Sequence, residues 1–175
     1  MQVLGDVLTR WHEFYTLLGT AAGTLVALLF VAASVASGVF STDRRAPMRI
    51  FLSATVVHFS SVLVVSLILL APIDDWVVLG ALVMLCALVG IGYCGLVWRD
   101  AARDGLAAKI DLEDRTWYAL LPVVTYLGEA AAGVLLGMQR AEGWTVLAVS
   151  LTLLLVAGIH NAWDITVWSI TRRRE

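Results

Sequence analysis

Apolar residues are concentrated in five long segments of this chain, and polar residues are concentrated between them. Each segment is long enough to cross a hydrocarbon core of about 30 Å as an α-helix. The pattern therefore predicts an all-α polytopic membrane protein that forms a single membrane domain over residues 1–175. The five predicted transmembrane helices cover residues 14–38, 50–71, 76–98, 117–138 and 144–168.

The stretches outside these segments also have predicted roles. Residues 1–13 repeat apolar side chains at the spacing of one helix face, which predicts an amphipathic stub on the membrane surface before the first span. Residues 99–116 form the longest connection and are too few to fold as a separate domain. The connections at 72–75 and 139–143 are short, so we expect the spans that they join to be antiparallel neighbours.

Basic residues lie mostly on one side of the predicted spans. Ten of the twelve Lys and Arg residues fall within 39–49, 99–116 and 169–175, whereas Arg10 and Arg140 fall on the other side. Because basic loops are retained in the cytoplasm, this asymmetry predicts that the N-terminus lies outside and that the C-terminus and residues 99–116 are cytoplasmic. Six of the seven tryptophans lie near predicted span ends, which indicates an aromatic belt at the two membrane interfaces.

The composition excludes several classes of protein. With 60% hydrophobic residues, the chain is too apolar for a water-soluble domain. Acidic residues are mixed with the basic ones on the predicted cytoplasmic side, which argues against a nucleic-acid surface. The sequence contains no nucleophile motif, phosphate-binding loop or dinucleotide fingerprint, which favours a protein without enzymatic activity but leaves the question open.

Five polar residues inside the segments are the candidate functional residues: His58, Glu129, His160, Asn161 and Asp164. An ionised group at membrane depth costs at least about 2.5 kcal/mol, so we expect these side chains to face the bundle interior. Both histidines lie about 12 Å from the cytoplasmic boundary, and the glutamate lies about 18 Å from it. Thr125 and Tyr126 lie within one turn of Glu129 and are candidates to hydrogen-bond its carboxyl group.

This polar cluster has several interpretations. In the first, it is a structural clasp that fixes helix register through hydrogen bonds or ion pairs. In the second, it is an ion path or proton relay from Asp164 through the histidines to Glu129, because histidine titrates near neutrality. No cofactor is predicted outright, but His58 and His160 at equal depth are also candidate axial ligands of haem b. With Asp164 and Glu129, they supply ligand types that suit zinc or iron, although the usual spacings are absent.

Small residues indicate where helices pack closely. Such residues allow helix backbones in lipid to approach one another, either within one chain or between subunits. We also expect the Asn161–Asp164 end of the last span to pack against the Thr/Gly stripe of the first. The expected packing residues are Thr16, Gly19, Thr20, Gly23, Gly133 and Gly137.

Two stretches resemble a known group. Residues 14–15, 18–25 and 29–32, together with the ending Gly158–Asp164, are similar to the first and last helices of small uncharacterised bacterial five-span inner-membrane proteins. The resemblance implies an inner-membrane location and no particular activity. In that group Arg takes the place of His160, which favours an ion pair with Asp164 over haem ligation.

Three functions therefore stay open. The first is an ion or proton channel or transporter, expected to be a homo-oligomer because five spans are few for one chain. The second is an accessory or structural subunit that joins a membrane partner protein and has no chemistry of its own. The third is a membrane haem or metal redox protein that uses His58 and His160.

Overall fold

The computed structural model describes residues 2–37, 45–103 and 116–171. These residues are helical except for two short connections, and they contain no strand, so the all-α prediction is confirmed. Part of the predicted cytoplasmic loop, at 104–115, and the arginines at 172–174 lie outside the described residues. The elements are α1 (Gln2–Ser37), α2 (Arg45–Leu70), α3 (Trp76–Arg103), the π-helical turn η2 (Thr116–Leu120), α5 (Leu121–Gly137) and α6 (Glu142–Thr171).

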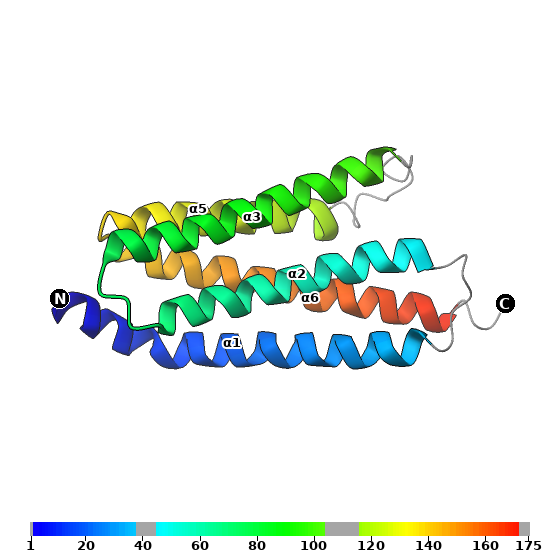
Figure 1. Ribbon diagram of the computed structural model, residues 1–175, viewed down its shortest axis with the longest axis horizontal. Coiled ribbons are helices and arrows are strands. Elements are labelled where there is room, and N and C mark those ends of the chain that lie inside the picture. The colour runs from blue at the N-terminus through cyan, green and yellow to red at the C-terminus, as the bar shows by residue number, and fades with distance from the viewer. Residues whose placement is uncertain (1, 38–44, 104–115, 172–175) are drawn as a thin grey trace.

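The helices form an elongated bundle of three layers (Figure 1). α2 and α6 form the middle layer, α1 covers one side of it, and α3 and α5 cover the other. The connections α2–α3 and α5–α6 lie at the end of the bundle that holds the N-terminus, and the C-terminus lies at the opposite end. The helices joined by these short connections are antiparallel. Below, the two ends are called the N-terminal end and the C-terminal end of the bundle.

Four of the described helices are long and apolar enough to cross a membrane. Their span candidates are Trp11–Ser34, Trp76–Asp100, Thr116–Gly137 and Glu142–Asp164. They identify the chain as a membrane protein, because so many apolar helices of this length match the thickness of a bilayer and not the core of a water-soluble fold. The fifth helix, α2, contributes a shorter apolar stretch at Ala54–Leu70 and does not meet the same length.

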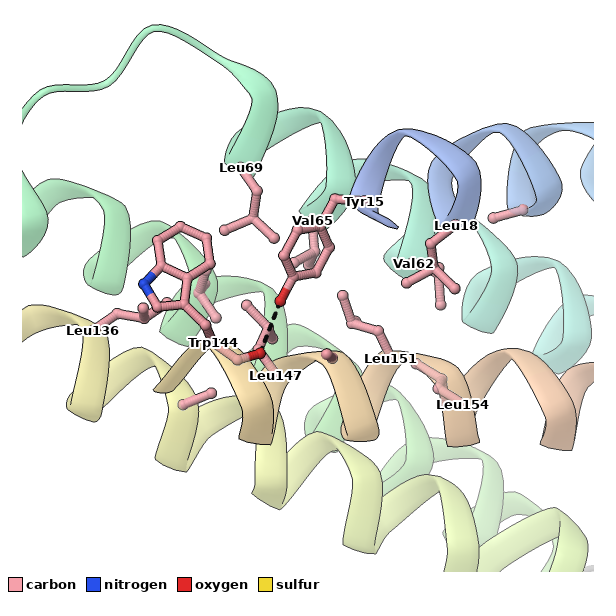
Figure 2. Close-up of a cluster of buried hydrophobic side chains, with 14 of the residues drawn as sticks. Tyr15, Leu18, Val62, Val65, Leu69, Leu136, Trp144, Leu147, Leu151 and Leu154 are labelled. Atoms are coloured by element: carbon pink, nitrogen blue, oxygen red, sulfur yellow. Dashed lines mark hydrogen bonds between the residues drawn. The ribbon is translucent and has the colours of Figure 1, made fainter. Parts of the chain in front are cut away.

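The residues 2–13 continue directly into the first span as one helix with it. At this N-terminal end, Tyr15, Leu69 and Trp144 are part of a fully buried cluster (Figure 2). The Tyr15 hydroxyl donates a hydrogen bond of 2.9 Å to the backbone carbonyl of Trp144, and Trp76 meets the same indole edge-on. Trp144 was expected in a lipid-facing belt, but these neighbours enclose it and leave it 0% exposed.

Candidate functional site

The site is positioned by an unusually close contact between α3 and α5. A Cβ atom added to Gly80 would collide with the backbone of Gly133, and it would lie 2.7 Å from the amide nitrogen of Gly137. Only glycine fits at residue 80, because the backbone of α5 occupies the space of a side chain there. Gly133 and Gly137 therefore lie at a helix contact within this chain.

The stripe of small residues on α1 is divided between two faces. A Cβ atom at Gly19 would lie 2.9 Å from the Ser66 Cβ, and Gly23 faces Leu63, so the glycines pack against α2. Thr16 and Thr20 were expected on the same packing face, but both are exposed, and the Thr20 hydroxyl donates to the Thr16 carbonyl of its own helix. A threonine that satisfies its hydroxyl within its own helix needs no partner helix, so it can face outward.

The expected contact between the end of the last span and the stripe on α1 is also not found among the described residues. α1 packs mainly on α2, whereas α6 packs mainly on α5 and α2. The part of α6 that carries His160 lies instead against η2, as the ring contact described below demonstrates. The two glycines of the stripe, Gly19 and Gly23, face Ser66 and Leu63 of α2 instead.

A buried hydrogen bond joins α2 to α5 in the bundle interior. His58 is 2% exposed and Tyr126 is 0% exposed, and the His58 Nδ1 lies 3.0 Å from the Tyr126 hydroxyl oxygen. The Tyr126 ring occupies the space that a side chain at Gly90 of α3 would need. Gly90 therefore makes room for the tyrosine, and the tyrosine holds the imidazole in a fixed orientation.

Glu129 lies on the same face of α5, between Tyr126 and Gly133. It is 1% exposed, and its Oε1 has no hydrogen-bond partner among the described residues. Because its neighbours on this face contact α3, its carboxyl group also faces α3, where Cys86 lies within electrostatic range. The candidate donors do not supply its partner: Tyr126 bonds to His58, and Thr125 donates to the Pro122 carbonyl at 2.8 Å.

The remaining candidate residues form a separate group where α6 meets η2. The His160 ring stacks on Trp117, with ring centres 4.0 Å apart and planes inclined by 6°. Its Nδ1 lies 3.3 Å from Asp164 Oδ2 without the geometry of a hydrogen bond, and both side chains are partly exposed. Asn161 is buried with no described partner for its side-chain amide, while its backbone carbonyl accepts a bond of 3.4 Å from the Tyr118 hydroxyl.

The structure thus brings the candidate residues into two groups. The interior group consists of His58, Tyr126 and Glu129, and the η2 group contains Trp117, Tyr118, His160, Asn161 and Asp164. Trp117 is one of the tryptophans expected in the aromatic belt, where a ring near a span end faces lipid, so its stack on His160 is not predicted by the sequence. The sequence indicates Tyr126 only as a neighbour of Glu129, because nothing in a sequence shows which helix lies opposite.

The positions of the candidate ligands do not suit a metal ion or a haem group. Among the described residues, no three His, Cys, Asp or Glu side chains converge as metal ligands. A cavity of about 490 Å³ between α2, α3 and η2 is lined by His58 but not by His160, which is stacked on Trp117. Axial haem ligands must face each other across one macrocycle, and these two imidazoles do not share a cavity.

Comparisons with known proteins give no guide to the function of the site. No protein-family model, curated protein or solved structure matches the chain. The function must therefore be inferred from the buried groups themselves, of which the interior group is the most completely enclosed.

Proposed function

We propose that this protein conducts ions or protons across a membrane and that the interior group lies on the path. The carboxyl group of Glu129 carries this proposal, because it is 1% exposed and one of its oxygens has no described hydrogen-bond partner. Ionisable groups inside a membrane protein are costly, and those that persist commonly mark ion pathways and proton relays.

The neighbours of Glu129 have the chemistry that a relay needs. Tyr126 lies one turn away on the same face, and its hydroxyl can both donate and accept a hydrogen bond. The His58 imidazole, bonded to that hydroxyl at 3.0 Å, can accept a proton on one nitrogen and release one from the other. The cavity beside His58 extends toward Trp98 and Tyr118, near the C-terminal end of the bundle.

The topology belongs to the same proposal. α2 has 26 residues, about 39 Å at 1.5 Å per residue, and it lies among the other helices along the bundle, which supports a role as a fifth span. The exposed Arg99 and Arg103 lie near the C-terminal end of the bundle, which supports a cytoplasmic location for that end in a bacterial inner membrane.

A homo-oligomer is proposed for a physical reason. The buried cluster around Trp144 fills the interior at the N-terminal end of the bundle, so one chain offers no ready pathway there. In a homo-oligomer, the interface between subunits would provide the part of the path that the interior of one chain does not.

Proton flux into liposomes tests the proposal. Purified protein is reconstituted with a trapped pH-sensitive dye, and flux is started by a potassium-diffusion potential. We expect Glu129→Gln to abolish flux while the protein remains folded. The control is Glu142→Gln, which changes an exposed carboxyl group, 62% accessible, at the start of α6 and should leave flux unchanged. Absence of flux for any common ion with the unmodified chain, or full flux with Glu129→Gln, contradicts the proposal.

A second candidate function is supported by the contacts themselves. The His58–Tyr126 hydrogen bond and the Trp117–His160 stack each tie two elements together, as a purely structural clasp would do. An accessory subunit without chemistry would show no flux, and Asp164→Asn would only lower its melting temperature and yield. The liposome assay therefore separates the two functions.

A further inference from the structure

We propose that the cavity between α2, α3 and η2 binds a lipid-soluble molecule with a planar oxygenated ring, of the quinone and quinol class. This inference does not depend on ion conduction. The cavity volume of about 490 Å³ lies within the range of about 300–1,000 Å³ that is typical of small-molecule sites. Its walls come from four different elements, since Val123 of α5 also lines it, so it is a feature of the assembled bundle.

The buried polar side chain in the cavity wall is that of His58. The Nδ1 of this residue is already bonded to the Tyr126 hydroxyl at 3.0 Å. Nε2 is therefore the imidazole atom left for an occupant. If the tyrosine donates to Nδ1, Nε2 carries the proton and can donate to a carbonyl oxygen; if Nδ1 donates, Nε2 can accept from a hydroxyl group. The same imidazole thus suits a quinone carbonyl and a quinol hydroxyl.

The remaining walls favour a ring over a charged headgroup. Tyr93, Trp98 and Tyr118 are aromatic residues of the lining, and none of the described lining residues is a Lys or Arg. Aromatic side chains pack well on planar rings in offset or edge-on geometries. A phosphate headgroup would find no cationic partner among the described lining residues, whereas a ring oxygen finds a hydrogen-bonding partner in His58.

The cavity is also reachable from the bilayer. Gly95, Trp98 and Leu120 line it, and all three are exposed on the surface of the bundle. Trp98 and Leu120 belong to helices that are long and apolar enough to span the membrane. A lipid-soluble molecule can therefore enter sideways, without crossing water.

Two glycines of α3 provide a matched pair of variants. Gly95 lines the cavity and Gly92 does not, while both are exposed and have no atom within 4 Å of an added Cβ. Gly95→Leu therefore adds a side chain at the cavity wall with no contact at its Cβ, and Gly92→Leu adds the same side chain outside the lining. Equal melting temperatures of the two variants show that both remain folded.

The probe is decylubiquinone, titrated into protein in mild detergent while quenching of tryptophan fluorescence is recorded. We expect saturable quenching, a Kd raised at least about tenfold by Gly95→Leu, and no change with Gly92→Leu. His58→Leu should raise the Kd about fivefold, the effect of one lost hydrogen bond. The proposal is overturned by non-saturable quenching or by equal Kd values for the two glycine variants. It is also overturned if decanol, which has the alkyl chain but no ring, competes with decylubiquinone as strongly as ubiquinone-1 does.

Discussion

Gly90→Ala is the most direct test of how the interior group is held. The Tyr126 ring occupies the position of a Cβ at residue 90, so the substitution must push the ring away and break its hydrogen bond to His58. Overpacking costs about 1–3 kcal/mol, and the lost hydrogen bond costs about 1 kcal/mol. Alanine regains about 1 kcal/mol of helix propensity over glycine. The free energy of unfolding should therefore fall by about 1–3 kcal/mol.

Thermal unfolding in detergent, followed by tryptophan fluorescence, measures this loss. For a chain of this length 1 kcal/mol corresponds to about 2–4 °C, so Gly90→Ala should lower Tm by about 2–12 °C. Gly92→Ala is the matched control, because it lies on the same helix with no atom within 4 Å of its added Cβ. The control should leave Tm unchanged or raise it slightly.

A double-mutant cycle with Tyr126→Ala shows whether the ring is responsible. In that background the space beside residue 90 is empty, so Gly90→Ala should no longer destabilise the protein. The reasoning fails if Gly90→Ala melts at the same temperature as Gly92→Ala. It fails equally if the alanine costs as much without the Tyr126 ring as with it.

Three further changes are measured by the same thermal assay. Gly80→Ala should destabilise the protein by about 3 kcal/mol or more, since the α3 and α5 backbones must separate. Gly137→Ala is the control and should be neutral, because its added Cβ meets no atom within 4 Å. Equal effects of the two substitutions would contradict the α3–α5 crossing. Tyr15→Phe should cost about 1 kcal/mol through its lost bond of 2.9 Å to α6, and an unchanged Tm would contradict it. Trp117→Leu should cost about 0.5–1.5 kcal/mol through its stack on His160, a loss that must vanish in His160→Ala.

The apolar pattern was sufficient to predict where most helices lie. The segment predicted at 76–98 is α3, Trp76–Arg103, and the segment predicted at 117–138 is η2 with α5. The agreement has a physical reason, because a membrane requires long uninterrupted apolar runs and the chain must turn where they end. α2 is the exception, since its described apolar stretch is shorter than the others.

The pattern could not predict which face of each helix is buried. In a soluble bundle apolar residues mark the core, but here Leu17 of α1 is 71% exposed while Leu18 is 6% exposed. Lipid and core are equally apolar, so hydropathy does not distinguish these two faces. For the same reason the sequence predicts one packing face for Thr16 and Gly19, although only the glycine faces α2.

The hydrogen bonds of the polar interior bear on the choice between a clasp and a functional site. A clasp needs satisfied partners, and the bond between His58 and Tyr126 meets that requirement. Glu129 does not, because the hydroxyl groups of Thr125 and Tyr126 bond elsewhere and its Oε1 remains without a described partner. A buried unsatisfied polar group costs about 1–3 kcal/mol, and an apolar side chain of similar size would avoid that cost. Helix register accounts for the histidine and the tyrosine but gives no reason for a carboxyl group at residue 129, and the proposed ion or proton path would supply one.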